Sequence, residues 1–164
     1  MAGAGEASSV DIGEIWDGSK AVDFAMKFLG ELSKHARIRS AVVIGSRARG
    51  AWKKWSDIDL VIVSDCKLGE ALWSTKGFGV VDARPYTWEE LVEGIMRAEV
   101  EIIEAFEYGK VLVDDGTWSR ARALYEKVRN ALGIERYGEG WRIRRKIPKS
   151  ELEKMLGEIP PGSK

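Results

Sequence analysis

Apolar and polar positions follow two different rhythms along this chain of 164 residues. Apolar residues that recur every three or four positions predict amphipathic helices, whereas short unbroken apolar runs predict buried strands. Four such runs predict strands at residues 41–44, 58–63, 80–84 and 110–113. The helical spacing predicts helices at residues 20–34, 68–74, 87–97, 99–107 and 117–132, with a short final helix near the end of the chain.

Capping residues mark several of the expected helix starts. Ser19 stands directly before the first helix, where its hydroxyl can accept a hydrogen bond from a free backbone N–H. Thr87 with Glu90, and Ser150 with Glu153, have the spacing of a capping box, in which each side chain binds the backbone of the other residue. These signals predict where three of the helices begin.

The order of the elements indicates one small α/β or α+β domain, because helices and strands are mixed without strict alternation. We expect residues 1–18 to form a flexible tail, residues 19–133 to form the folded domain, and residues 134–164 to form a basic C-terminal extension with a short helix. At the second boundary, the glycine-rich segment 133–140 predicts a linker, and the alternating segment 141–144 predicts an edge strand.

Composition excludes several classes of function. The 26 basic and 26 acidic residues balance, which argues against broad nonspecific binding to nucleic acid. One cysteine and one histidine exclude an internal disulfide and a zinc site of the usual kind, and a single thiol fits a reducing cytoplasm. No apolar run approaches the length of a membrane span.

One segment departs from this balanced charge. Residues 136–149 are locally basic and include Tyr137 and Trp141, so this segment could contact nucleic acid or an acidic partner. The alternative is an edge strand whose charges protect it from pairing with other chains. The sequence favours the edge strand without excluding the binding surface.

Three aspartates carry the candidate chemistry. Asp57 and Asp59 are two residues apart on an extended segment, so both side chains leave the same face. Adjacent carboxylates repel each other unless a cation lies between them, and hard oxygen ligands select Mg²⁺ or Mn²⁺. Asp82 lies within another apolar run, and it can join the pair if that strand neighbours residues 58–63. Taken singly, Asp-x-Asp is typical of a solvated turn, and Asp82 could equally be a helix cap or a salt-bridge partner.

The residues before the aspartate pair suit an anion. Gly45 ends the first apolar run and lets the backbone approach a phosphate closely. Ser46 can cap a following helical turn whose free N–H groups face that anion. Arg47 and Arg49 add positive charge where a triphosphate would lie, although arginines in such a loop equally often form surface salt bridges. The sequence therefore predicts a phosphate-binding end followed by a metal-binding end.

The string GSRARG at residues 45–50, followed by SDIDLVIV at residues 56–63, resembles the signature of the DNA-polymerase-β-like nucleotidyltransferase superfamily. Over about residues 38–113 it is especially similar to the small prokaryotic group called minimal nucleotidyltransferases. The resemblance implies an α/β (α+β) fold with a small mixed β-sheet and helices packed mainly on one face, and it makes 19–133 the nucleotidyltransferase domain. The residues that carry it are Gly45, Ser46, Asp57, Asp59 and Asp82.

The resemblance also implies a reaction, in which a nucleoside monophosphate passes from a triphosphate such as ATP to a hydroxyl and pyrophosphate is released. Asp57 and Asp59 would ligate two Mg²⁺ ions, with Mn²⁺ as an alternative. Asp82 would ligate the ion nearer the acceptor and help to deprotonate the acceptor hydroxyl. The implied phosphate-binding set comprises Gly45, Ser46, Arg47 and Arg49.

Partners follow from the same resemblance. Small members of this group often pair with a helical HEPN protein, which implies that the chain is the antitoxin-like half of a two-gene module and modifies a hydroxyl of that partner. A homodimer is also compatible with the sequence. Two alternatives stay open: a non-catalytic module that neutralises its partner by covering it, and nucleotidyl transfer to a small molecule or RNA.

Overall fold

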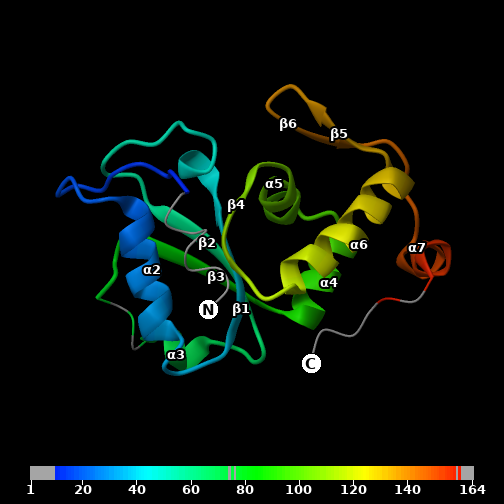
Figure 1. The fold of residues 1–164 in the computed structure, drawn as a ribbon. Helices are drawn as coiled ribbons and strands as arrows, with labels where there is room; N and C mark the ends of the chain where they lie inside the picture. Colours follow the sequence, from blue (N-terminus) through cyan, green and yellow to red (C-terminus); the bar gives the residue numbers. More distant parts are fainter. Residues whose placement is uncertain (1–9, 74, 76, 158, 160–164) are drawn as a thin grey trace.

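The computed structural model describes residues 10–73, 75, 77–157 and 159, and its centre is a four-stranded sheet (Figure 1). The strands are β1 (Ile38–Ile44), β2 (Ile58–Ser64), β3 (Val81–Thr87) and β4 (Lys110–Asp114). Their order in the sheet is β3-β2-β1-β4. Strand β1 runs antiparallel to both of its neighbours, whereas β2 and β3 run parallel. The mixed sheet that the resemblance implied is therefore confirmed.

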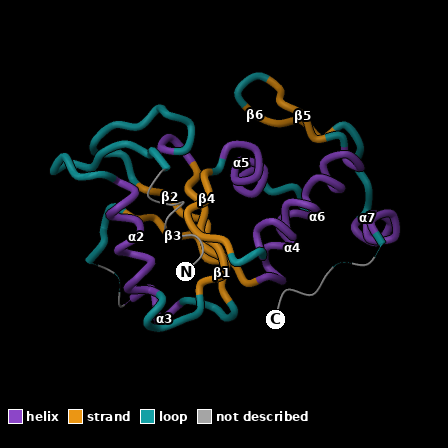
Figure 2. Tube along the Cα trace, in the orientation of Figure 1, coloured by secondary structure: helices purple, strands orange, loops and turns teal. Residues whose placement is uncertain are grey.

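Helices cover both faces of this sheet (Figure 2). Most of the helical residues lie on one face, as the resemblance implied, in α4 (Trp88–Met96), α5 (Val100–Tyr108) and α6 (Thr117–Leu132). On the opposite face, α2 (Ala21–Leu32) and α3 (Gly69–Trp73) add a second helical layer that the resemblance did not imply. Among the residues that the structure describes, no helix has the length and apolar character that a membrane crossing needs.

The alternation of side chains along β2 explains the two layers. Ile58, Leu60 and Ile62 pack with residues of α2 in one buried cluster. Val61 and Val63 pack with residues of α4, α5 and α6 in another. Because successive side chains of a strand point to opposite faces, an unbroken apolar run needs a core on each side. The apolar runs in the sequence therefore predicted a strand that is buried from both faces.

The segment before α2 differs from the flexible tail expected over residues 1–18. Residues 1–9 lie outside the described part of the chain, but residues 10–18 pack onto the domain. Ile12 and Ile15 are buried in the cluster that also contains the apolar face of α2. Two isoleucines removed from water stabilise this segment against the sheet domain, so the expectation is wrong for residues 10–18.

Two of the predicted helix caps have different outcomes. Ser19 does not cap α2, because its backbone N–H and its hydroxyl both donate to the Asp17 carboxylate, and Lys20 precedes the helix without a side-chain cap. The capping box at α4 is confirmed. The backbone N–H of Glu90 donates to the Thr87 hydroxyl over 3.2 Å, and the N–H of Thr87 donates to the Glu90 carboxylate over 2.9 Å.

The glycine-rich segment expected to be a linker, residues 133–140, forms most of a β-hairpin instead. Strand β5 (Ile134–Tyr137) pairs antiparallel with β6 (Gly140–Ile143), which confirms the strand expected over nearly the same residues as β6. Gly133 ends α6 with φ +66°, and Gly138 lies between the two strands with φ +61°. Both glycines occupy the left-handed region that other residues avoid, so they fix turns rather than provide flexibility.

The final helix, α7 (Lys149–Leu156), begins before the expected capping residue. Pro148 precedes its first residue, no side chain caps it, and the capping box expected between Ser150 and Glu153 is not formed. Leu152 is buried in the cluster that α4, α5 and α6 share. The described part of the C-terminal extension therefore packs on the same core as the sheet domain.

Candidate active site

Two neighbouring strands bring two of the three aspartates together. Asp59 on β2 and Asp82 on β3 occupy the same position in the parallel register. On its other side, Asp59 is opposite Ile44, the last residue of β1. Asp82 was expected to join the aspartate pair if its strand lay next to residues 58–63, and β3 does lie next to β2. Gly45 follows Ile44 directly, so the chain leaves β1 beside the same carboxylates.

The Gly45 backbone lies against the Asp59 carboxylate. Gly45 begins a short 3₁₀ turn, η1 (Gly45–Arg47), with φ +77°. A Cβ atom placed on Gly45 would lie 2.6 Å from Oδ2 of Asp59, which is closer than real Cβ atoms come. Glycine is required here both for the left-handed backbone and for this close approach. The Ser46 hydroxyl next to it makes no hydrogen bond with any described residue, so it can bind a ligand.

The three carboxylates differ in their exposure to solvent. The Asp59 side chain is 24% exposed and that of Asp82 is 51% exposed, and Asp57 is also exposed. Burial raises the pKa of the Asp59 carboxyl above its ordinary value. The nearby Arg84 guanidinium opposes this shift, while the negative charges of Asp82 and Asp57 add to it. Asp59 is thus the carboxylate with the strongest need of a neighbouring positive charge.

Arg84 on β3 partly supplies that charge, and the sequence analysis did not identify it. Its Nη2 atom lies 3.0 Å from Oδ2 of Asp82 and 3.9 Å from Oδ1 of Asp59. Its Nη1 atom donates to one oxygen of Glu101 on α5, and the Tyr86 hydroxyl donates to the other oxygen. The hydrogen bond with Glu101 raises the pKa of Arg84 further. Asp82, Arg84 and Tyr86 alternate along one strand, so their shared face was readable in the sequence.

The donor set suits a hard divalent cation in its chemistry. Three carboxylates near one end of the sheet supply oxygen ligands of the kind that Mg²⁺ prefers. Among the described residues, no three acidic, histidine or cysteine side chains lie close enough together, as they stand, to hold a metal ion. Asp82 is paired with Arg84 instead. Asp57 and Asp82 are both exposed, so neither carboxylate is enclosed by the apolar core.

The structure places Arg47 differently from the phosphate-binding position expected for it. Its side chain is fully buried, and its guanidinium donates to the backbone carbonyls of Ile12, Lys53 and Ser56 over 2.8–3.2 Å. The Trp52 ring lies 5.7 Å from its Cζ atom. Burial lowers the pKa of this guanidinium, and it makes four hydrogen bonds to the carbonyls, while it has five N–H donors in all. Arg47 therefore joins the loop after η1 to the N-terminal segment and is not presented to a phosphate.

Arg49 is the more accessible of the two arginines. Its side chain is 44% exposed, and its Nη1 atom lies 3.3 Å from Oε1 of Glu104 on α5. Its backbone N–H donates to the Gly45 carbonyl over 3.2 Å, which ties it to the start of η1. Four residues were expected at the phosphate, and three of them lie close together in or just after η1 and are at least partly exposed: Gly45, Ser46 and Arg49. Their role toward a phosphate stays a prediction.

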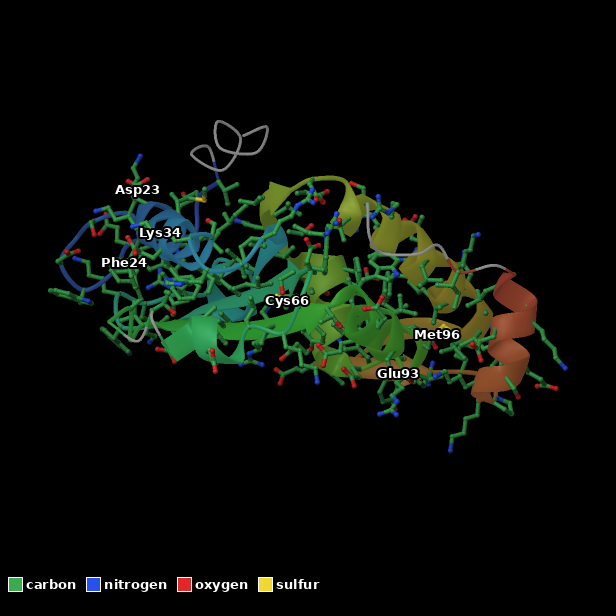
Figure 3. The ribbon with its side chains drawn as sticks, turned by 90° about the horizontal axis from the view of Figure 1, so that it is seen from below. Asp23, Phe24, Lys34, Cys66, Glu93 and Met96 are labelled. Carbon is green, nitrogen blue, oxygen red and sulfur yellow. The ribbon has the colours of Figure 1, made fainter. Side chains whose placement is uncertain are left out.

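A large cavity lies elsewhere in the molecule. It has a volume of about 590 Å³, and its lining includes Glu93, Met96, Lys149 and none of the three aspartates. Glu93 and Met96 lie in the part of the molecule next to α7 (Figure 3). Lys149 of α7 donates to Glu93 of α4 over 2.6 Å and closes one side of this cavity. The candidate chemistry therefore lies at an end of the sheet and not in this cavity.

Comparison with known proteins identifies a family for this chain and a similarity of fold to solved structures. The sequence model of the nucleotidyltransferase domain family matches residues 25–129, from within α2 to within α6. No curated protein matches the chain. A crystal structure of a toxin-antitoxin with AMP-PNP is similar to the fold at a TM-score of 0.45 and 13% identity, and the match covers 68% of this chain and 91% of that one. Similarity at this level supports no conclusion about the site.

Proposed function

Because this chain belongs to the nucleotidyltransferase domain family, we propose that it transfers AMP from ATP to an acceptor hydroxyl and releases pyrophosphate. One observation carries the proposal: Asp59 and Asp82 are side by side in register, and the Gly45 backbone packs against Asp59. A phosphate held at Gly45 would therefore lie next to a cation held by the carboxylates. Such proximity is what phosphoryl and nucleotidyl transfer require.

Asp57, Asp59 and Asp82 are the residues that would hold two Mg²⁺ ions, for which Mn²⁺ can substitute. The bound ions would supply charge neutralisation at the α-phosphate and at the leaving pyrophosphate. The proposal is supported by the acidic donor set. Burial, together with the negative charges of Asp82 and Asp57, raises the pKa of Asp59, so a cation bound beside it would favour its charged form. Arg84, which pairs with Asp82, would be the group that a divalent cation replaces beside that carboxylate.

The other end of the site would bind the β- and γ-phosphates. The Ser46 hydroxyl and the backbone around Gly45 are accessible, and Arg49 is half-exposed beside them. A guanidinium has five N–H donors, so Arg49 can bind Glu104 and a phosphate at the same time. Arg47 acts indirectly, because its bonds to three carbonyls hold the loop that follows η1.

The transfer step exchanges one bond to phosphorus for another. The acceptor oxygen forms a bond to the α-phosphorus, while the bond between that phosphorus and the α,β-bridging oxygen breaks. The electron pair of the broken bond leaves with pyrophosphate. The Asp82 carboxylate takes the proton of the acceptor hydroxyl, and its exposed position on β3 makes it accessible to an acceptor that arrives from solvent.

The acceptor in this proposal is a hydroxyl of a helical HEPN-type partner protein, with this chain as the antitoxin-like half of a two-gene module in the cytoplasm. The support is the similarity of the segments at residues 45–50 and 56–63 to minimal nucleotidyltransferases.

The test uses ATP labelled at the α-phosphate, Mg²⁺, and the helical protein encoded by the neighbouring reading frame. We expect label on that protein, no label from γ-labelled ATP, and no transfer by Asp59→Asn. Asp23→Asn removes an exposed carboxylate on the opposite face and should transfer label like the wild type. Transfer by Asp59→Asn at the wild-type rate would contradict the proposed chemistry, and label on RNA alone would replace the proposed acceptor.

A further inference from the structure

Glu104 on α5 accepts contacts from two parts of the chain that are distant in sequence. Trp141 of the β5–β6 hairpin donates through Nε1 to Oε2 of Glu104 over 2.7 Å. Arg136 of the same hairpin has its Nη1 atom 3.6 Å from that oxygen. The other carboxylate oxygen pairs with Nη1 of Arg49, in the loop that follows η1, over 3.3 Å. The Glu104 side chain is only 18% exposed, so each oxygen is held in place.

The hairpin that holds Glu104 lies outside the family domain. The family match ends at residue 129, and the hairpin lies beside α5 (Figure 1). The Arg136 guanidinium is 5.7 Å from the Tyr108 ring and 5.3 Å from the Trp141 ring, and cation–π contacts at such distances stabilise its position. A part of the chain beyond the family domain therefore fixes a carboxylate within it.

Glu104 in turn contacts Arg49, one of the residues predicted to bind the phosphates. The Arg49 backbone N–H is hydrogen-bonded to the Gly45 carbonyl, so the peptide of Arg49 cannot move independently of η1. Its side chain alone is free to choose a direction, and the pairing with Glu104 selects one. An arginine held in one direction loses less conformational entropy when it binds a phosphate than a mobile one does.

We infer that Glu104 is a positioning residue that the C-terminal hairpin holds in place, and that it directs Arg49 toward the β- and γ-phosphates of the nucleotide. The inference rests on the proposed function, since it requires a triphosphate at Gly45 and Ser46. It extends the nucleotide site to hairpin residues beyond residue 129, where the family match ends. Arg136 thereby gains a role other than protection of an edge strand.

The test is the dissociation constant of a non-hydrolysable ATP analogue with Mg²⁺, measured by calorimetry on the full chain. Trp141→Phe removes the N–H donor but keeps a large ring in the same packing. We expect the affinity to fall about threefold to tenfold, the size expected for a lost hydrogen bond to a charged group. In the Arg49→Gln background, the same substitution should have no further effect, because the residue that it positions is gone.

Two further variants keep the test decisive. Arg142→Gln is the matched control, because Arg142 pairs with Glu135 inside the hairpin and not with Glu104, so its affinity should equal that of the wild type. Glu104→Gln removes the charge that Arg49 faces and should weaken binding at least as much as Trp141→Phe, which covers the case in which the tryptophan variant fails to fold.

The outcomes separate this inference from the proposed function. Wild-type affinity in Trp141→Phe and Glu104→Gln would overturn the inference, as would an equal loss in Arg142→Gln. If the wild type binds the analogue and transfers label while these variants behave like it, only the inference fails. If the wild type itself does not bind the analogue with Mg²⁺, the proposed function fails and the inference fails with it.

Discussion

The two faces of the central sheet differ most clearly at two adjacent residues of β2. Leu60 is fully buried in the apolar cluster that it shares with the buried face of α2. Asp59, one residue earlier, points to the opposite face and lies beside Asp82 and Arg84. Because its side chains alternate, β2 contributes core residues to the face covered by α2 and candidate site residues to the opposite face. We therefore expect substitutions on the face covered by α2 to lower stability, and substitutions of the charged residues on the other face to lower kcat.

The second face is itself divided along the strand. Val61 and Val63 lie in the core formed by α4, α5 and α6, while the charged network occupies the end where β2 begins. Two carboxylates of α5 extend this network, since Glu101 binds Arg84 and Glu104 binds Arg49. The apolar layer on the first face lets this end of the sheet carry several charges without loss of the fold.

The largest expected effect is that of Asp59→Asn on catalysis. Loss of one carboxylate from the metal-binding set should lower kcat by about 10³-fold or more, because charge stabilisation at the α-phosphate depends on it. The thermal midpoint should not fall, since the residue is not part of the apolar core. The rate of label transfer measures kcat, and calorimetric melting of the same preparation measures the thermal midpoint. A lower thermal midpoint with a normal kcat would contradict the assignment of chemistry to this face of the sheet.

Leu60→Ala should show the opposite pattern. Removal of a fully buried leucine side chain leaves a cavity beneath α2 and should lower the free energy of unfolding by about 2–5 kcal/mol. Under conditions where the variant is folded, its kcat should remain that of the wild type. Urea unfolding and label transfer provide the two readouts. A variant of normal stability and low activity would show that the scaffold face is not separate from the chemistry.

Gly45→Ala tests the contact between the turn and the carboxylate. The new Cβ atom meets Asp59, so η1 must shift, and a displacement of that kind can lower kcat/KM by about 10²-fold. Gly50→Ala is the matched control: its φ is +76°, close to the +77° of Gly45, but no atom lies within 4 Å of its Cβ position. Both variants should lose about 1–2 kcal/mol of stability from the left-handed backbone. Equal activity in the two would contradict the role of the close approach.

Arg84→Gln tests whether the arginine competes with a metal ion for the carboxylates. Without the guanidinium beside Asp82 and Asp59, Mn²⁺ should bind about threefold to tenfold more tightly in the absence of nucleotide, as expected for loss of a partly exposed ion pair. Electron paramagnetic resonance of free Mn²⁺ measures this affinity. Arg97→Gln, on an exposed arginine paired with Glu93, should leave it unchanged. Equal or weaker Mn²⁺ binding in Arg84→Gln would show that Arg84 does not compete.

The smallest expected effect concerns pH. Since the pKa of Asp59 is raised in the folded state, its contribution to stability is present at low pH and is lost as the pH rises through the folded pKa. In the metal-free protein, Asp59→Asn should therefore raise the free energy of unfolding at about pH 7, and this gain should be smaller near pH 4, close to the ordinary pKa of an aspartate. Urea unfolding at both values checks it. A gain that is equal at both values would show that the carboxylate charge is not its source.

Much of the fold was predictable because apolar spacing is local information. The four strands of the sheet and the helix begun by Thr87 and Glu90 follow from runs, periods and caps that neighbouring residues define. The sequence predicts that Asp82 lies beside Asp59 only if their two strands are neighbours. Whether they are neighbours depends on how the whole sheet packs, which the parallel register of β2 and β3 now shows. The charge pattern alone could not decide which of several carboxylates would meet.

What the sequence missed depended on distant partners. Arg47 was expected at a phosphate, but a carbonyl of Ile12, far earlier in the chain, accepts from it and holds it inside. The sequence predicts Arg84 only as the last residue of a strand. Its place beside the aspartates depends on Glu101, which binds it from a later helix. Gly133 and Gly138 lie in the segment for which the sequence predicts a linker, although their positive φ angles end α6 and turn the hairpin.

The most direct test of the central claim is a crystal structure of the full chain with Mn²⁺ and a non-hydrolysable ATP analogue, with anomalous scattering used to locate the metal. The account predicts an anomalous peak within coordination distance of carboxylate oxygens of Asp59 and Asp82, with the triphosphate along η1. Manganese and nucleotide bound elsewhere, for example in the cavity beside α7, with Asp59 and Asp82 unliganded, would contradict it.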